Sequence, residues 1–326
     1  MNGRRSWRRT YRLFGTALAT IALAACVPTR PGSGHSAPPA GQPGATISAS
    51  LPPGGSGTAT TRAPSSGERS GPSRWPAVKP DHIVVVILEN KAPAQIDANP
   101  AAPYLNALMR TAAVLTGSRA VTHPSQPNYL ALFSGSTQDV DDDHCLGSLG
   151  NRPNLGRQLL DTGRTFVGYS EGLPAVGFTG CSSGRYAAKH NPWKNFANLP
   201  SATNQPATAF PSDFSRLPTV AFVVPDLCHD MHDCSVATGD AWLREHLDAY
   251  ARWAAAHNSL LVVTFDEDDK SAGNHILTFL VGAPVWPGRY GQPVDHYGLL
   301  ATMEDLYGLG RLGRAASATA LTGIWR

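Results

Sequence analysis

Acidic, amide and histidine side chains follow three apolar segments of this 326-residue sequence, at points where strands would end. The three segments read HIVVVIL, TVAFVV and LLVVTF. The polar residues that follow them are Glu89, Asn90, Asp230, His232, Asp266 and Glu267. Clustered carboxylates repel one another unless a cation lies between them. Oxygen ligands suit Ca²⁺ or Mg²⁺, and the histidines leave room for Zn²⁺ or Mn²⁺. A solvated loop would explain any one of these groups, but it explains three of them less well, so we expect one divalent metal ion here.

A hydroxyl that could act as a nucleophile lies in THPSQPNYLALFSG, residues 122–135. Pro127 suits the first turn of a helix, Ser125 lies near its N-cap and Gly135 could end it. The simplest interpretation of Ser125 is therefore a capping residue. The same geometry favours phosphate chemistry, because free N–H groups and the positive end of the helix dipole stabilise an anion. A nearby metal would lower the pKa of the hydroxyl, and Asn128 could hold a phosphate oxygen.

Cationic side chains occur in two further segments. RYAAKHNPW contains Lys189 and His190, which could bind phosphate or protonate a leaving group. A basic surface loop is the alternative. DHYGLLATMEDLYGL places His296 near the start of a helix, where it could contact phosphate or could simply be a capping or core histidine.

Apolar runs that alternate with helical patterns indicate an α/β fold. Continuous Val, Ile and Leu strands are typical of a mostly parallel sheet sandwiched between helices. We expect strands at 82–88, 164–169, 219–224, 260–265 and 276–281. We expect helices at 103–115, 127–134, 153–162, 238–257 and 297–308. In such sheets ligands bind beyond the carboxyl ends of the strands, which is where the polar groups fall.

The N-terminal quarter of the chain has the features of an export signal and a tether. Residues 1–25 combine a basic n-region, a short apolar stretch and small residues, and LAAC resembles a lipobox in which Cys26 is lipidated. An ordinary secretory signal is the alternative, and a pair of arginines leaves Sec and Tat export both open. Residues 26–76 are rich in Pro, Gly, Ser and Thr and predict a disordered tether. The globular domain is then 77–326, anchored to a membrane or secreted.

Four further cysteines favour disulfides in an exported domain. Cys228 and Cys234 could close a small loop, and Cys145 with Cys181 would form the other bridge. A zinc site made of Cys228, His229, His232 and Cys234 is the alternative. The net charge of +3 is of mixed sign, without a long basic stripe, so nothing indicates a nucleic-acid binder or an obligate protein partner.

The order of motifs resembles the bacterial phosphoesterase family, which includes secreted acid phosphatases and certain phospholipases C. The motifs are VVVILEN, THPSQPNYLALFSG, EGLP, YAAKHNPW, HDMHDCS, GDAWL, LLVVTFDEDD and DHYGLLATMEDLYGL, and they cover residues 80–326. The resemblance implies an alkaline-phosphatase-like fold. It also implies an exported acid phosphatase that cleaves phosphomonoesters, small molecules or phosphoinositides such as phosphatidylinositol 3-phosphate, through a phosphoserine.

The resemblance also implies roles for individual residues. Glu89, Asn90, Asp266 and Glu267 would bind the metal, Ser125 would be the nucleophile, and His190 and His232 would be active-site histidines. Weaker matches are His123, Asp230 and His296. Two-zinc members of the superfamily have Asp-His where this chain has Asp266-Glu267, so one metal ion is expected. A phospholipase C-type phosphodiesterase and an inactive envelope lipoprotein are the alternative functions.

Overall fold

The computed structural model describes residues 73–326. The expected signal peptide, the lipidation site Cys26 and nearly all of the tether lie outside the described residues. Ser73 pairs with Trp325, and Trp75 packs against the core, so contacts with the domain reach ahead of the expected start at 77. Among residues 73–326, no helix is long and apolar enough to cross a membrane.

Residues 73–326 contain five α-helices and ten strands. The α-helices are α1 (Pro103–Met109), α2 (Ser125–Ser134), α3 (Leu155–Asp161), α4 (Val236–Ala256) and α5 (His296–Tyr307). The strands are β1 (His82–Leu88), β2 (Ala113–Ser118), β3 (Phe166–Ser170), β4 (Ser182–Ser183), β5 (Tyr186–Ala187), β6 (Asn204–Pro206), β7 (Val220–Val224), β8 (Ser259–Phe265), β9 (Thr278–Val281) and β10 (Gly288–Val294). Short 3-10 turns connect several of them, including η2 (Ala188–His190).

One eight-stranded sheet forms the centre of the domain, in the order β10-β2-β9-β8-β1-β7-β3-β6. All neighbouring strands pair in parallel except β9, which runs antiparallel to β2 and β8. β1 pairs with β8 along its whole length, from His82 opposite Ser259 to Leu88 opposite Phe265. The expected α/β architecture with a mostly parallel central sheet is confirmed.

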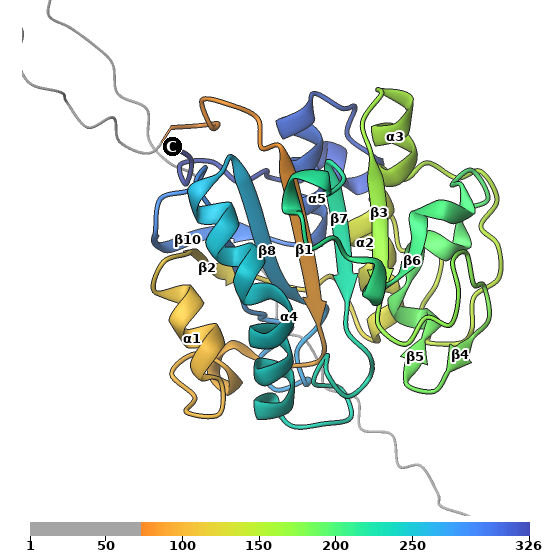
Figure 1. The fold of residues 1–326 in the computed structure, drawn as a ribbon, viewed down its shortest axis with the longest axis horizontal. Helices are drawn as coiled ribbons and strands as arrows, with labels where there is room; N and C mark the ends of the chain where they lie inside the picture. Colours follow the sequence, from red (N-terminus) through yellow and green to blue (C-terminus); the bar gives the residue numbers. More distant parts are fainter. Residues whose placement is uncertain (1–72) are drawn as a thin grey trace, which may run out of the picture. The chain divides into compact units, whose positions relative to one another are not determined.

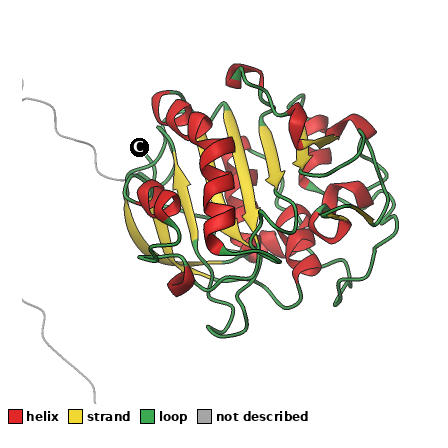
Figure 2. Ribbon diagram, turned by 60° about the horizontal axis from the view of Figure 1, so that its bottom comes forward, coloured by secondary structure: helices red, strands yellow, loops and turns green. Residues whose placement is uncertain are grey.

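Both faces of the sheet are buried, because alternate residues of β1 enter two different cores. Ile83, Val85 and Ile87 pack with α2, α3 and α5. Val84, Val86 and Leu88 pack with α1 and α4. A strand that is buried on both faces reads as a continuous apolar run, as β1 does. Figure 1 shows α1 and α4 in front of the sheet, and Figure 2 shows helices on both sides of the yellow strands.

Capping residues in the sequence mark the ends of several helices. Asn154, Ser235 and Asp295 cap the N-termini of α3, α4 and α5 through their side chains. Gly135 ends α2 in the left-handed conformation with φ 70°, which a residue with a Cβ adopts only at a cost. The expected position of α2 is thereby confirmed, with a start at Ser125 instead of 127.

Five strands differ from the sequence-based expectation: β2, β10 and the short strands β4, β5 and β6. The helix expected at 103–115 ends at Met109, and its last residues belong to β2. This part of the prediction is wrong because Ala113, Val114 and Leu115 are buried by pairing with β9 and β10, which helical periodicity cannot reveal. β10 was not expected, because GRYGQPV is polar and contains proline, as suits a strand at the edge of a sheet.

Candidate active site

Three segments meet at the carboxyl ends of the central strands. Glu89 and Asn90 directly follow β1, and Asp266 directly follows its neighbour β8. The backbone N–H of Asp266 donates to the carbonyl of Leu88 at 2.9 Å, and that of Glu89 donates to the carbonyl of Asp230 at 2.8 Å. These bonds extend the sheet beyond its strands. They hold the polar residues in fixed register, which explains why a core strand runs straight into a carboxylate.

Ser125 begins α2 at this edge and is 1% exposed. Its hydroxyl Oγ donates to Oε2 of Glu89 at 2.9 Å. The carboxamide of Asn90 faces the same Glu89 oxygen and Oδ1 of Asp266, at 2.6 and 3.3 Å when its NH₂ group points toward them. The opposite orientation would present its oxygen to a cation. A hydroxyl, a carboxamide and two carboxylates are therefore grouped around one point.

The other oxygen of Glu89 belongs to a second group of side chains. Tyr129, four residues after Ser125 on α2, donates its hydroxyl to Oε1 of Glu89. His190 lies between two carboxylates, with Nε2 3.2 Å from Glu89 Oε1 and Nδ1 3.2 Å from Asp230 Oδ2. The ring of Tyr129 stacks on that of His190 with centroids 5.1 Å apart. All four side chains are buried.

The rim of the site carries the more exposed charges. Lys189 Nζ is 2.9 Å from Asp143 Oδ2 and 3.4 Å from Nε2 of His232. On another side His123 lies between two acids, with Nδ1 2.7 Å from Glu267 Oε2 and Nε2 3.1 Å from Asp268 Oδ1. Lys189, Asp143 and His232 therefore lie together at the rim. Glu267 faces His123, whereas Asp266 lies with the Ser125 group.

Burial makes this concentration of acids electrostatically unfavourable. Burial, followed by the charges of Asp266 and Asp230, raises the pKa of Glu89 well above its usual range. Burial and the charge of Glu267 do the same to the pKa of Asp266. The pKa of Glu267 rises to about 7 through burial and the charge of Asp143. Carboxylates in such surroundings ionise readily only when a cation compensates them.

The donor set suits a divalent cation by its chemistry and by its unsatisfied atoms. Oδ2 of Asp266 and Oδ2 of Asp230 are buried without a hydrogen-bond partner, because the 3.2 Å contact of Asp230 Oδ2 with His190 Nδ1 lacks hydrogen-bond geometry. One nitrogen of His190 and one oxygen each of Glu89 and Asp230 lie within 4.8 Å of one another, which is close enough to bind one ion. Oxygen-rich sites of this kind favour hard ions, and the histidine permits Zn²⁺.

His190 and His232 differ as proton donors. Burial, together with the charges of Lys189 and His232, lowers the pKa of His190 well below its usual range. A neutral, enclosed imidazole is a poor general acid. His232 is exposed at the rim, with Nδ1 2.7 Å from Asp233 Oδ1. Of the two expected catalytic histidines, His232 is therefore better placed to donate a proton.

Asn128 does not fit its expected role as a phosphate ligand. Its Oδ1 accepts from the N–H groups of Val121 and Thr122 at 2.9 and 3.1 Å. Its Nδ2 donates to the carbonyls of Thr122 and Pro124. The side chain is 1% exposed and its hydrogen-bonding groups are occupied. We correct the expectation: Asn128 shapes the loop that leads to Ser125.

His296 also departs from the expected phosphate-binding role. It is 1% exposed at the start of α5, and its Nε2 is 2.6 Å from the backbone carbonyl of Asp266. A buried imidazole that bonds the backbone cannot reach a phosphate in the crevice. This contact corrects the expectation and makes His296 a brace for Asp266.

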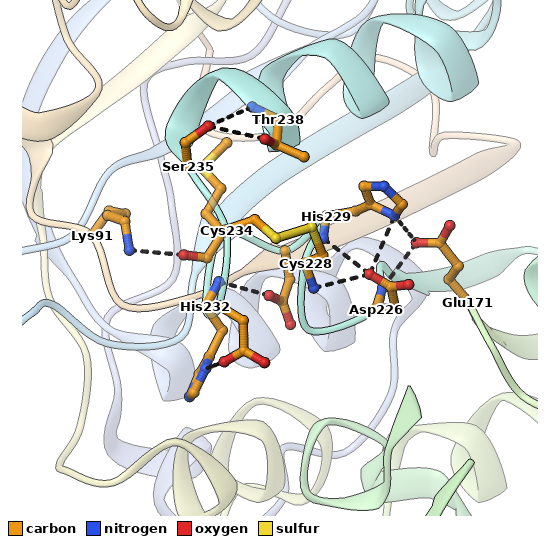
Figure 3. Close-up of a disulfide and its surroundings, with 12 residues drawn as sticks. Lys91, Glu171, Asp226, Cys228, His229, His232, Cys234, Ser235 and Thr238 are labelled. Atoms are coloured by element: carbon orange, nitrogen blue, oxygen red, sulfur yellow. Dashed lines mark hydrogen bonds and ion pairs between the residues drawn. A yellow bond between two sulfur atoms is a disulfide. The ribbon is translucent and has the colours of Figure 1, made fainter. Parts of the chain in front are cut away.

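A second group of possible metal ligands consists of Glu171, Asp226 and His229. His229 Nδ1 is 2.9 Å from Glu171 Oε2 and 3.2 Å from Asp226 Oδ1. The same carboxylate oxygens also accept backbone N–H groups. In Figure 3 this group lies on one side of the Cys228–Cys234 disulfide and His232 on the other. The three side chains satisfy one another and brace the loop that carries the active-site residues.

Both disulfides have the pairing expected from the sequence. Cys145 is bonded to Cys181, and Cys228 to Cys234. The alternative zinc site that used Cys228 and Cys234 as ligands is therefore not formed. The short loop closed by the second disulfide contains Asp230 and His232, so the covalent bond limits how far these side chains can move.

Two residues of the site were not expected from the sequence. Tyr129 could have been found, because it lies one helical turn after Ser125 and therefore on the same face of α2. Asp143 gives no such signal, because it is the last acid of a DDD run that reads as a solvated loop. Only the tertiary structure brings it to Lys189.

The chain is similar to known phosphatases. Residues 97–310 match the model of the Phosphoesterase family. The chain is 50% identical over 246 residues to the phosphatidylinositol-3-phosphatase of Mycobacterium tuberculosis, covering 75% of this chain and 82% of that protein. It is 31% identical over 255 residues to the phosphate-repressible acid phosphatase of Penicillium chrysogenum, covering 72% of this chain and 60% of the fungal protein.

The fold is similar to that of solved structures. A protein of the alkaline phosphatase superfamily from Vibrio parahaemolyticus superposes with a TM-score of 0.50 at 13% identity. The match covers 77% of this chain and 72% of that one. The expected alkaline-phosphatase-like fold is confirmed by this likeness.

Proposed function

The chain belongs to the phosphoesterase family and is a phosphoric monoester hydrolase, and we propose that it is a metal-dependent acid phosphatase that works through a phosphoserine on Ser125. The observation that carries the proposal is the hydroxyl of Ser125. It is buried at a helix N-terminus, hydrogen-bonded to Glu89 and grouped with Asn90 and Asp266. A hydroxyl in such a position has anion-stabilising N–H groups on one side and cation-binding oxygens on the other.

We place the divalent ion on the Oε2 side of Glu89. Glu89, Asn90 and Asp266 would hold it there, because Asp266 retains an unpaired buried oxygen and Ser125 lies at the same point. On the Oε1 side Tyr129 already donates a hydrogen bond to Glu89. When bound, the ion would polarise a phosphate oxygen and lower the pKa of the Ser125 hydroxyl.

The residues of the chain then divide the reaction between them. Glu89 Oε2 orients the Ser125 hydroxyl by accepting its hydrogen, and the hydroxyl proton passes to solvent water as Oγ attacks phosphorus. Lys189 at the rim stabilises the negative charge of the transferring phosphoryl group. His232 gives a proton to the departing alkoxide, which leaves as the alcohol. Water then cleaves the phosphoserine by the reverse path and releases inorganic phosphate.

We expect higher activity at acid pH, because a protonated group must assist the departing alkoxide. The acid-phosphatase names of the fungal relatives support this reading. The name of the mycobacterial relative supports phosphatidylinositol 3-phosphate as one substrate, since the two chains share half of their aligned residues. We also propose export, which two disulfides support, and attachment to the membrane through a lipidated Cys26.

The test is turnover by the purified protein and its Ser125→Ala variant, with p-nitrophenyl phosphate and a short-chain phosphatidylinositol 3-phosphate. We expect the variant to keep less than about a hundredth of the activity. Rapid acid quenching of the wild-type protein with ³²P-labelled substrate should trap a label on Ser125. Ser134→Ala, at the other end of α2, is the matched control and should retain turnover.

Other outcomes would contradict parts of the proposal. Activity that survives Ser125→Ala would exclude Ser125 as the nucleophile. Release of diacylglycerol from phosphatidylcholine in preference to phosphate from a monoester would favour the phosphodiesterase alternative. Failure of the wild-type protein to turn over either monoester with any of Ca²⁺, Mg²⁺, Mn²⁺ or Zn²⁺ would support an inactive lipoprotein.

A further inference from the structure

Asp143 joins the nucleophile's helix to the cationic rim of the site. Its Oδ1 accepts the backbone N–H of Gln126, the residue after Ser125, at 2.9 Å. Its Oδ2 is 2.9 Å from Lys189 Nζ. One carboxylate thus bridges the first turn of α2 and the lysine that we assign to phosphate binding.

The loop that carries Asp143 is fixed to α2 by a single buried side chain. Gln126 is 2% exposed, and its Nε2 donates to the carbonyls of Asp142 and His144 at 3.1 and 2.9 Å. Together with its backbone N–H, Gln126 contacts three consecutive residues of the loop. The carboxylate of Asp143 is therefore held in place by the same helix that positions Ser125.

A disulfide connects the loop that carries Asp143 to the segment that carries Lys189. Cys145, two residues after Asp143, is bonded to Cys181. The carbonyl of Cys181 accepts the N–H of Ala188, the residue before Lys189, at 2.9 Å. Asp143 is thus two residues from one cysteine of this disulfide, and the residue before Lys189 is hydrogen-bonded to the other cysteine. Such bracing reduces the entropy that an exposed ion pair loses when it forms.

The ion pair leaves part of the lysine available. An ammonium group has three N–H donors, of which the bond to Asp143 uses one and the longer contact with His232 Nε2 faces a second. Without the carboxylate, the ammonium of Lys189 would lose this ion pair and keep the weaker 3.4 Å contact with Nε2 of His232. Asp143 therefore holds Lys189 at the rim, where its other donors can meet a substrate's phosphate.

We propose that Asp143 is a positioning residue for phosphate binding, acting through Lys189. This inference rests on the proposed function, because it requires that Lys189 binds the phosphate group. A carboxylate in this position could instead compete with phosphate for Lys189 and for the Gln126 N–H. The two roles predict opposite effects of removing the charge, so one series of variants distinguishes them.

The experiment compares Asp143→Asn, Lys189→Gln, the double variant and Asp141→Asn in the purified protein. KM and kcat for p-nitrophenyl phosphate and the inhibition constant of inorganic phosphate are measured for each. We expect Asp143→Asn to raise KM and the phosphate inhibition constant about tenfold, with kcat changed by less than about threefold. In the Lys189→Gln background the same change should add less than about twofold. Asp141→Asn removes the same charge from an exposed position of the same loop and should change neither constant.

Asp143→Glu provides the second test. It keeps the charge and should recover at least part of the phosphate affinity, whereas a purely structural defect would not be rescued. Melting temperatures show whether each variant is folded, and Asp143→Glu with Lys189→Gln suffices if Asp143→Asn does not fold.

Tighter phosphate binding by Asp143→Asn would overturn the proposal in favour of competition. Additive effects of the two substitutions would show that Asp143 acts without Lys189 and would also overturn it. If Lys189→Gln alone changes neither constant, the assignment of Lys189 in the proposed function fails, and the role of Asp143 fails with it. If Ser125→Ala remains active, the proposed function fails at the nucleophile, whatever the Asp143 series shows.

Discussion

Removing the proposed divalent ion should destabilise the protein, because the buried acids at the strand ends would then lack a counter-charge. Glu89 is 0% and Asp266 1% exposed, and mutual repulsion adds to burial in raising their pKa values. A ligand that binds only the folded state at a hundred times its dissociation constant stabilises that state by about 2.7 kcal/mol. For a domain of this size that amounts to a rise of about 5–11 °C in melting temperature.

The assay is differential scanning calorimetry of protein stripped with EDTA, passed through a desalting column and reloaded separately with Ca²⁺, Mg²⁺, Mn²⁺ or Zn²⁺. The variant Glu89→Gln tests the site, and its effect on the melting temperature should differ between the metal-free and the metal-loaded protein. Without metal it should melt no lower than the stripped wild type, because it removes one of the repelling charges. With metal it should lose most of the rise. This readout does not depend on turnover.

Glu171→Gln is the matched control, because Glu171 also follows a central strand but belongs to the group with Asp226 and His229. It should keep the full metal-induced rise. The reasoning is refuted if none of the four ions raises the melting temperature of the stripped protein. It is also refuted if Glu89→Gln keeps the rise while Glu171→Gln loses it, which would move the metal to the second group.

Three further outcomes are expected. Burial raises the pKa of Glu304 from its ordinary value of 4.5 to about 8. The free energy of unfolding should therefore fall, by at most about 5 kcal/mol, as the pH rises from about 4.5 to about 8. Chemical denaturation of Glu304→Gln across this pH range should show none of that loss. Gly168→Ala should destabilise by more than about 2 kcal/mol in urea unfolding, because the new Cβ would lie 2.0 Å from the buried ring of Trp193. Tyr129→Phe removes the hydroxyl that bonds Glu89 and should lower kcat/KM about tenfold and weaken metal binding in a titration, with little change in fold.

The carboxyl edge of the sheet could be predicted from the sequence because its signals are local. An apolar run that ends in Glu89-Asn90, and another that ends in Asp266, place polar groups at strand ends without any knowledge of tertiary contacts. The parallel sheet then brings these ends together. β2 could not be predicted in the same way. Ala113–Ser118 is short, and its burial depends on pairing with β9 and β10, which come more than 150 residues later.

The roles of individual polar residues were harder to predict than their positions, because hydrogen bonding decides them. Asn128 and His296 are in the expected segments. The carboxamide of Asn128 and Nε2 of His296 are nevertheless bonded to nearby backbone, which indicates that both support the site without facing the substrate. Sequence position alone cannot distinguish a side chain that faces a crevice from one that turns back to the main chain.

The role of Asp143 could not be predicted from the sequence, because it depends on contacts that only the fold creates. Asp141, Asp142 and Asp143 are chemically identical neighbours, and a run of three acids has the composition of a solvated loop. What separates them is that one carboxylate meets the N–H of Gln126 and the ammonium of Lys189. Lys189 lies 46 residues away along the chain. A contact of that kind depends on the path of two loops and the disulfide between them. Comparing Asp141→Asn with Asp143→Asn therefore tests whether the position of the carboxylate matters, because both variants remove the same charge from the same loop.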